Sequence, residues 1–258
     1  MALVQEIMAV YPYLSSRQKA PSVGRPVNAL VLLQTLASNE ETQMKLMESG
    51  IPFLLYPFLQ HNHKMKFLRV VSLGVIGALV KPENSAIIKM FLGTELLPLC
   101  LDIMRLDKDD VTKVVATFIL ERILEDPYGS ETVCSRLDVF ENIVNTLKGM
   151  IEQKATSMRL IKHIFRCFQF LSGKCANSSN EQLRHVLADR FRAVQQLVRQ
   201  KPEILDQEPM KKCFNEIMNN LGQAQQPPVS YVQFPPFFPY NQFPQQFIPD
   251  PSSYAGGR

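Results

Sequence analysis

Similar apolar segments recur along the chain, and this repeat limits the possible folds more than any other feature. The segments cover residues 27–37, 67–80, 111–124 and 158–171. Successive copies are 40, 44 and 46 residues apart when four equivalent positions are aligned, namely Leu30, Val70, Val114 and Leu160. Each segment is apolar around most of its circumference, which is typical of a helix buried between neighbouring helices. The repeat therefore predicts a stack of similar helical units.

A second element recurs between these segments. Residues 45–54 resemble residues 90–99, and Pro52 and Pro98 lie 46 residues apart. In both copies a helix is expected to end near a glycine, and the proline then opens the next helix, where its missing N–H costs nothing. A weaker third copy covers residues 131–150.

One unit is thus a short helix, a turn, a proline-initiated helix, a loop and a long buried helix. A period of about 40–47 residues is typical of armadillo and HEAT repeats. Strand signals are nearly absent. We predict an all-α, armadillo/HEAT-like helical repeat solenoid, with a non-repeating helical bundle as the alternative.

Capping and turn residues give the expected boundaries. Residues 38–41 and 109–110 predict helix starts, and residues 126–130 predict a break. Residues 173–180 are expected to be a loop. Helices over 181–200 and 209–221 are then expected to cap the solenoid, because terminal repeats need a polar outer face.

The composition changes near the end of the chain. Eight prolines and eight Tyr or Phe residues fall between residues 223 and 258, with many glutamines and almost no charge. Such a segment cannot form a packed core. We predict a repeat domain over 1–222 and a disordered Pro/Phe/Gln-rich tail over 223–258. The tail is interpreted either as short linear motifs or as a solvated segment with no partner.

Charge, cysteine content and hydropathy limit the class of protein. The formal net charge is +4, which permits an acidic or nucleic-acid partner but does not require one. The five cysteines are odd in number and irregularly spaced, which favours a reducing intracellular compartment over a disulfide framework. The first residues do not resemble a secretory signal, and the longest apolar stretch, 70–80, is too short to span a membrane.

Motifs for catalysis or metal binding are missing from the sequence. No nucleophile elbow, His-Glu-x-x-His motif or phosphate loop is present. His61 and His63 have no further ligand at a motif distance and are interpreted as a loop pair. His163 lies in an apolar segment and is expected to be a satisfied core histidine. We predict no enzymatic activity, no cofactor and no metal site.

Several strings together resemble a known family. They occupy residues 3–7, 29–34, 51–59, 72–81, 98–101 and 115–120, and the string SLGVIGALVK at 72–81 is the most specific. The chain resembles the armadillo subunit of the CCR-NOT deadenylase complex, subunit nine, the "required for cell differentiation" family. The resemblance covers residues 2–172.

This resemblance implies a non-catalytic adaptor in messenger-RNA deadenylation, decay, translational repression and RNA-mediated gene silencing. The implied partners are the central NOT scaffold subunit and short peptides of RNA-binding repressors, with nucleic-acid binding and homodimer formation as further family properties. The implied location is the cytoplasm, including P-bodies, and the nucleus, with no membrane association. The alternative is an armadillo-type nucleic-acid-binding protein that acts outside the complex.

Three departures from the family pattern lead to further expectations. The chain begins where family members are already well into their domain, so we expect an N-terminally shortened, divergent copy with altered scaffold docking. Leu137 and Val139 replace the Tyr and Arg of family members that accept tryptophans, so we expect no tryptophan capture. The segment from Gly173 onward is expected to diverge from the family.

The resemblance also indicates where peptides bind. Phe67, Gly74 and Val115 match positions that line the concave peptide-docking surface in the family. Gly74 has no side chain and would let a partner approach closely. Amphipathic helices bind such grooves through apolar anchors at helical spacing. The alternative is that Phe67 and Val115 belong to the core.

A basic strip is the second candidate site. Arg159, Lys162 and Arg166 follow the spacing i, i+3 and i+7 and share one helix face. Repeat packing would place them beside Lys113 and Arg69 on the equivalent helices, in a groove suited to phosphates or an acidic peptide. The alternative is a solvated face.

Overall fold

The computed structural model describes residues 2–14, 22–60, 65–81, 84–153 and 156–222, and within these ranges every regular element is a helix. The elements are α1 (Ala2–Met8), α2 (Tyr11–Leu14), α3 (Gly24–Ala37), α4 (Glu40–Glu48), the 3₁₀ helix η1 (Ile51–Leu55), α5 (Tyr56–Leu59), α6 (Lys66–Val80), α7 (Ser85–Leu92), α8 (Leu96–Leu106), α9 (Asp110–Glu125), α10 (Pro127–Cys134), α11 (Leu137–Ile151), α12 (Met158–Ala176), α13 (Glu181–Gln200), the 3₁₀ helix η2 (Pro202–Leu205) and α14 (Glu208–Asn220). The predicted tail over 223–258, His61 and His63 lie outside the described residues.

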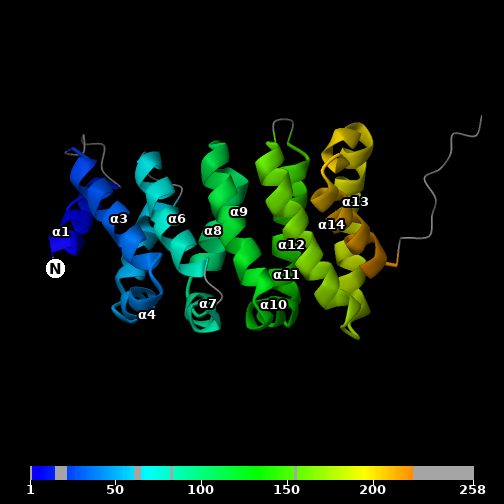
Figure 1. Ribbon diagram of the computed structural model, residues 1–258, viewed down its shortest axis with the longest axis horizontal. Coiled ribbons are helices and arrows are strands. Elements are labelled where there is room, and N and C mark those ends of the chain that lie inside the picture. The colour runs from blue at the N-terminus through cyan, green and yellow to red at the C-terminus, as the bar shows by residue number, and fades with distance from the viewer. Residues whose placement is uncertain (1, 15–21, 61–64, 82–83, 154–155, 223–258) are drawn as a thin grey trace, which may run out of the picture. The chain divides into compact units, whose positions relative to one another are not determined.

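The helices stack as consecutive repeats, as Figure 1 shows. Helices α4, η1–α5 and α6 form one unit, helices α7, α8 and α9 the next, and helices α10, α11 and α12 the third. The long helices α3, α6, α9 and α12 each pack against the next one in this series. The predicted all-α armadillo architecture is confirmed, and each of the four repeated apolar segments lies within one of these long helices.

Local sequence signals explain where the helices begin and end. The Asn39 side chain accepts a hydrogen bond from the Glu41 amide at the start of α4, and Asp109 caps α9 through the Thr112 amide. After α4 the chain turns at Gly50, whose φ of 72° is in the left-handed region that favours glycine. These ends agree with the sequence-based boundaries.

Two boundaries differ from the sequence-based expectation. Helix α12 continues to Ala176, so Gly173 is helical and not the start of a loop. The expected break over 126–130 is a single residue, because α9 ends at Glu125 and α10 begins at Pro127. Asp126 makes this short connection possible, since its carboxylate accepts the hydrogen bond of the Gly129 amide at the start of α10.

One continuous apolar core runs through the stacked helices. Each long helix contributes its buried face, and full burial of a leucine or phenylalanine side chain contributes about 1.5–3 kcal/mol to stability. Helix α13 matches the predicted range 181–200, and with α14 it covers the last repeat. Among the described helices, none combines the length and apolar character needed to cross a membrane.

Candidate functional site

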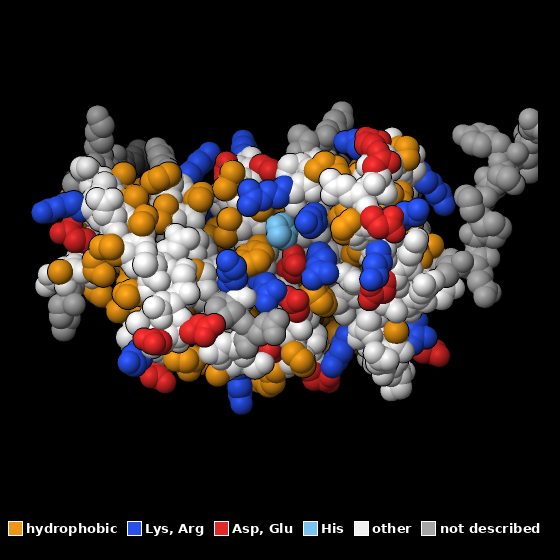
Figure 2. Space-filling view, in the orientation of Figure 1, with side chains coloured by type: hydrophobic (Ala, Val, Ile, Leu, Met, Phe, Trp, Pro, Cys, Tyr) orange, Lys and Arg blue, Asp and Glu red, His pale blue; other side chains and the backbone are white. Residues whose placement is uncertain are grey.

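The long helices α3, α6, α9 and α12 lie side by side and form one face of the molecule, which we call the long-helix face (Figure 1). Figure 2 shows the molecule from this side. Hydrophobic side chains gather over α3 and α6, whereas Lys, Arg, Asp and Glu side chains gather over α9, α12 and the helices beyond. All the sequence-predicted site residues lie on α6, α9 or α12.

Apolar residues that are not fully buried follow one stripe along α6 and one along α9. We call this set the apolar strip, and it consists of Phe67, Val70, Val111, Val115 and Phe118. Phe67 and Val111 are 61% and 54% exposed, which is unusual for side chains of this size. Their spacing of three or four residues keeps each stripe on one side of its helix. The strip therefore offers apolar anchors to a partner.

An open pocket of about 470 Å³ lies at the N-terminal end of the strip. Its lining is Lys66, Phe67, Val70, Lys108 and Asp109. The alternative that Phe67 belongs to the core is wrong, because more than half of its side chain is exposed. Val115 is partly buried and packs against the core, so it is both a core contact and a member of the apolar strip.

Gly74 lies beside a side chain of α3. A Cβ atom at this position would lie 3.3 Å from Oε1 of Gln34 and 3.5 Å from Cδ of the same side chain. The Gln34 side chain of α3 therefore lies beside Gly74, and both residues are partly exposed on the long-helix face. A Cβ atom at Gly77, one turn later, would lie 3.8 Å from the side chains of Val115 and Phe118, which is an ordinary packing distance between α6 and α9.

The structure removes Arg69 from the predicted basic strip. Arg69 is 1% exposed, and its Nη1 donates to Oδ2 of Asp107 at 2.5 Å while Nη2 donates to the Gln60 carbonyl at 2.8 Å. Ser72 and Leu73, which share a helix face with Arg69, are buried as well. Arg69 thus joins α6 to the loop before α9, and its guanidinium is not accessible to a phosphate.

Burial and hydrogen bonding act in opposite directions on the partner carboxylate. Burial raises the pKa of Asp107, but the amides of Asp109 and Lys108 and the Arg69 guanidinium donate to or lie beside the carboxylate. The net result is a pKa below its usual value. The surroundings therefore favour the charged form of the Asp107 carboxyl.

Lys113 is also withdrawn from the predicted strip. The residue is 8% exposed, and its Nζ donates to Oε1 of Gln153 at 2.6 Å. Of the predicted basic residues, Arg159 and Lys162 are exposed and Arg166 is partly buried. The predicted basic strip therefore does not run across α6, α9 and α12, because its exposed charges all lie on α12.

Arg166 belongs to a cluster of charges that sequence reasoning missed. Glu121 of α9 is 7% exposed and accepts from Nδ1 of His163 at 2.6 Å and from Nε of Arg166 at 3.5 Å. The Arg166 guanidinium also lies 5.1 Å above the Phe170 ring. We call Glu121, Lys162, His163 and Arg166 the charged cluster. The sequence signal that could have predicted this contact is the repeat period, because His163 lies 42 residues after Glu121, about one repeat along the chain.

The expectation for His163 is half right. Its ring is satisfied, through Glu121 and an edge-on contact with Phe118 at 5.8 Å. It is not a core residue, because its side chain is 20% exposed. The charged cluster borders an open pocket of about 540 Å³ between α9, α12 and α14. Lys212 and Glu216 of α14 also line this pocket.

Leu137 and Val139 begin α11 and pack partly against the core. Neither supplies the aromatic ring or hydrogen-bond donor that would hold an indole. No group of three or more His, Cys, Asp and Glu side chains within the described ranges is arranged to hold a metal ion. The long-helix face offers apolar contacts and paired charges, which suit binding of a macromolecule.

Comparisons with known proteins agree with this description. Residues 1–221 match the family model "Cell differentiation family, Rcd1-like". The match extends beyond the expected limit at residue 172, so α13 and α14 belong to the family domain. The protein "Cell differentiation protein rcd1" of Schizosaccharomyces pombe is 38% identical over 231 residues, covering 86% of this chain and 78% of the relative. "Protein CAF40" of Saccharomyces cerevisiae is 42% identical over 178 residues, covering 66% of this chain and 48% of the relative.

Solved structures support the fold. A designed armadillo repeat protein in complex with a (KR)4 peptide aligns over 86% of this chain with a TM-score of 0.53 at 12% identity. A second designed armadillo repeat protein aligns over 86% of the chain with a TM-score of 0.52 at 14% identity. At such low identity the likeness concerns the architecture alone.

Proposed function

Because the chain belongs to the cell differentiation family, Rcd1-like, we propose that it is a non-catalytic adaptor subunit of the CCR-NOT deadenylase complex. In this role it docks peptides of RNA-binding repressors and thereby promotes deadenylation, decay and translational repression of the bound messenger RNA. The central NOT scaffold subunit is its partner within the complex, and its sites of action are the cytoplasm and the nucleus.

The observation that carries the docking role is the apolar strip. Phe67 is 61% exposed and lies beside an open pocket, so its ring can be buried by a partner. Burial of a partner's leucine or phenylalanine against it contributes about 1.5–3 kcal/mol per side chain. Helices α6 and α9 lie in contact, and an amphipathic helix with anchors at i, i+4 and i+7 fits the surface between them.

Variants of the strip test this role. Val115→Glu and Phe67→Glu place a charge where apolar anchors dock, and each is expected to lower the affinity for repressor peptides by about tenfold or more. Tyr128→Glu is the matched control, because Tyr128 is 45% exposed but lies on α10 outside the strip. Fluorescence anisotropy with labelled peptides measures the effect. Equal affinities for the strip variants and the control would contradict the proposal.

Membership in the complex needs a separate test. The purified chain is mixed with the central NOT scaffold fragment, and the S. pombe relative serves as the positive control. Stable co-purification supports the adaptor role. Failure to bind by a chain with a folded helical spectrum would place its function outside the complex.

The alternative, a nucleic-acid-binding protein outside the complex, has less support. Arg69 and Lys113 are buried, so of the predicted strip Arg159 and Lys162 remain exposed. Arg166 is held by Glu121 and Glu125. Phosphate-driven binding weakens steeply with salt, whereas apolar docking does not. Affinity measured at two salt concentrations therefore separates the two functions.

A further inference from the structure

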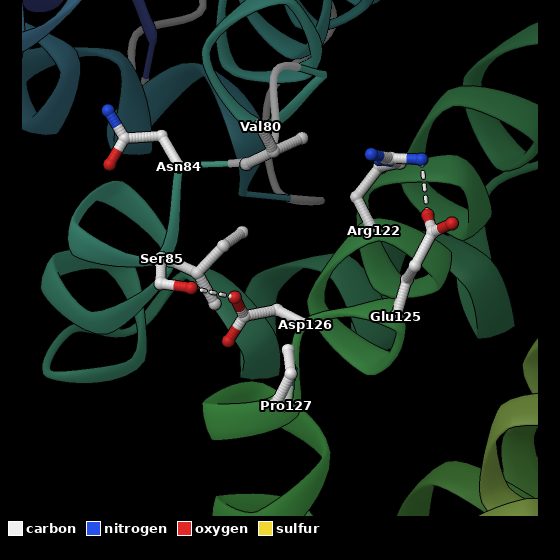
Figure 3. Close-up of a pocket in the computed structure, with 8 residues that line it drawn as sticks. Val80, Asn84, Ser85, Arg122, Glu125, Asp126 and Pro127 are labelled. Carbon is white, nitrogen blue, oxygen red and sulfur yellow. Dashed lines mark hydrogen bonds and ion pairs between the residues drawn. The ribbon is translucent and has the colours of Figure 1, made fainter.

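A third pocket lies at the C-terminal ends of α6 and α9 (Figure 3), whereas Phe67 is near the N-terminal end of α6. We call it the corner pocket, and its volume is about 330 Å³. It lies between two successive repeats, and its lining is Val80, Asn84, Ser85, Ile88, Arg122, Glu125, Asp126 and Pro127. Val80 and Ile88 supply apolar wall, and the other side chains are mostly polar.

The charges in the corner pocket do not balance. Arg122 carries one positive charge against the two negative charges of Glu125 and Asp126, so the formal sum is −1. Arg122 is already engaged, because it forms an ion pair with Glu125 and its Nη2 donates to the Lys81 carbonyl at 3.2 Å. Figure 3 shows this pair on one side of the pocket and Asp126 with Ser85 on the other.

Asp126 is the carboxylate without a cation. Its Oδ1 accepts from the Gly129 amide at 2.9 Å and its Oδ2 accepts from the Ser85 hydroxyl, and both donors are neutral. In the described part of the chain no Lys, Arg or His forms an ion pair with it. The cap interaction with α10 fixes the position of the carboxylate, so it is held in place for a ligand.

The corner pocket continues the apolar strip. Arg122 follows Phe118 by four residues and Val115 by seven, so all three side chains lie on one side of α9. Helix α6 has 15 residues and is therefore about 22 Å long. A helical peptide of similar length that rests its apolar side on the strip reaches the corner pocket with its last turn.

We propose that the corner pocket, through Asp126, Ser85 and the apolar wall of Val80 and Ile88, binds one arginine or lysine side chain of the peptide that docks on the apolar strip. This inference rests on the proposed docking function and specifies the chemistry of the partner. The apolar wall suits the methylene stem of such a side chain, and Asp126 and Ser85 suit its charged head. A divalent cation fits less well, because Arg122 already occupies Glu125 and hard cations need several oxygen ligands.

The pocket is first tested without a peptide. Butylguanidinium, an analogue of the arginine side chain, is titrated into the isotopically labelled full chain, and amide NMR shifts are followed. We expect a saturable shift of the Ser85 and Gly129 amides. Asp126→Asn should weaken this binding about fivefold or more, since a charge-assisted hydrogen bond is lost. Asparagine caps a helix as well as aspartate does, so the variant is expected to fold.

Glu181→Gln is the matched control, because it removes one exposed carboxylate from α13, away from the corner pocket. It should bind butylguanidinium as the wild type does. Shifts that do not saturate, or that are equal in Asp126→Asn and the wild type, would overturn the proposal.

A pair of peptides separates this inference from the proposed function. Both are helices of about 15 residues with leucines along one side, and they differ only in a final arginine or its neutral isostere citrulline. We expect the arginine peptide to bind the wild type about five- to tenfold more tightly and to lose this advantage on Asp126→Asn. Equal binding of both peptides would leave strip docking intact and overturn the subsite. If neither peptide binds, docking on the strip fails, and with it the role of the corner pocket as a peptide subsite.

Discussion

The N-terminal and C-terminal halves of the long-helix face present different chemistry to a partner. Over α3 and α6 several large apolar side chains are exposed, among them Val31 at 49% and Phe67 at 61%. Over α9 and α12 the same face carries the charged cluster, in which Glu121 is paired with His163 and Arg166 (Figure 2). Binding of a partner over the first half is favourable, because it removes apolar surface from water. In the second half most charges already have partners within the chain.

Two arginines, one from each half, illustrate the difference between the two halves of the long-helix face. Arg69 of α6 is 1% exposed and holds the loop before α9 through Asp107. Arg166 of α12 has a side chain that is 41% exposed, and its contacts with Glu121 and Glu125 are longer, at 3.5 and 3.9 Å. The Arg69 charge is therefore enclosed within the fold, whereas the Arg166 charge is paired but partly exposed at the surface.

The largest expected effect follows from the buried pair. Arg69→Met leaves the Asp107 carboxylate buried without its cation, and we expect the free energy of unfolding to fall by about 3–5 kcal/mol. Urea denaturation of the variant and the wild type measures this difference. A loss below about 1 kcal/mol would place Arg69 among ordinary surface charges and would remove the contrast between the halves.

The second prediction concerns Phe67. Because its ring is mostly exposed, Phe67→Ala should change the free energy of unfolding by less than about 1 kcal/mol. The same variant should lose about 2 kcal/mol of binding free energy for repressor peptides, since a buried aromatic anchor is typical of an interface hot spot. Denaturation measures the change in the free energy of unfolding, and fluorescence anisotropy on the same preparation measures the change in binding free energy. A large loss of stability with unchanged affinity would make Phe67 a structural residue.

The repeat made the fold predictable. Four apolar segments at regular spacing were enough to place α3, α6, α9 and α12, and cap residues such as Asn39 and Asp109 gave the helix starts. Apolar periodicity specifies which elements exist, because burial of one helix face dominates the energy of each unit. The one-residue connection at Asp126 was missed, since the Pro and Gly that suggested a loop also suit a first helical turn.

The candidate site was less predictable. The i, i+3, i+7 spacing placed Arg159, Lys162 and Arg166 on one helix correctly, but spacing along one helix does not show which residue of a neighbouring helix it meets. Arg69 was assigned to a surface, although the residues three and four positions later on its helix face, Ser72 and Leu73, are buried. Its partner Asp107 is 38 residues away, and only the packing of α6 against the loop before α9 brings them together.

The third prediction uses pH to sharpen the contrast at the buried pair. Asp107 has a pKa below its ordinary value of 3.8, so its charged form contributes stability above about pH 5, and this contribution is lost as the pH falls through the lowered pKa. Compared with Asp107→Asn, the wild type should be more stable near neutral pH, and the difference should shrink as the pH falls below about 4. Denaturation at several pH values measures it. A difference that is independent of pH would show that the charge of Asp107 is not what stabilises the loop.

The smallest expected effect comes from the charged cluster. Arg166→Met removes one of the two partners of Glu121, but His163 remains at 2.6 Å and the methionine can still cover the Phe170 ring. We expect the free energy of unfolding to fall by less than about 1 kcal/mol, and by less still in high salt, because His163 still satisfies the buried Glu121 and a long ion pair to a partly exposed arginine contributes little and is screened. Urea denaturation at low and high salt measures this, with Arg69→Met as the reference. If Arg166→Met costs as much as Arg69→Met, the charged cluster is a second structural ion pair, and the polar half of the face has no more free charge to offer a ligand than the apolar half.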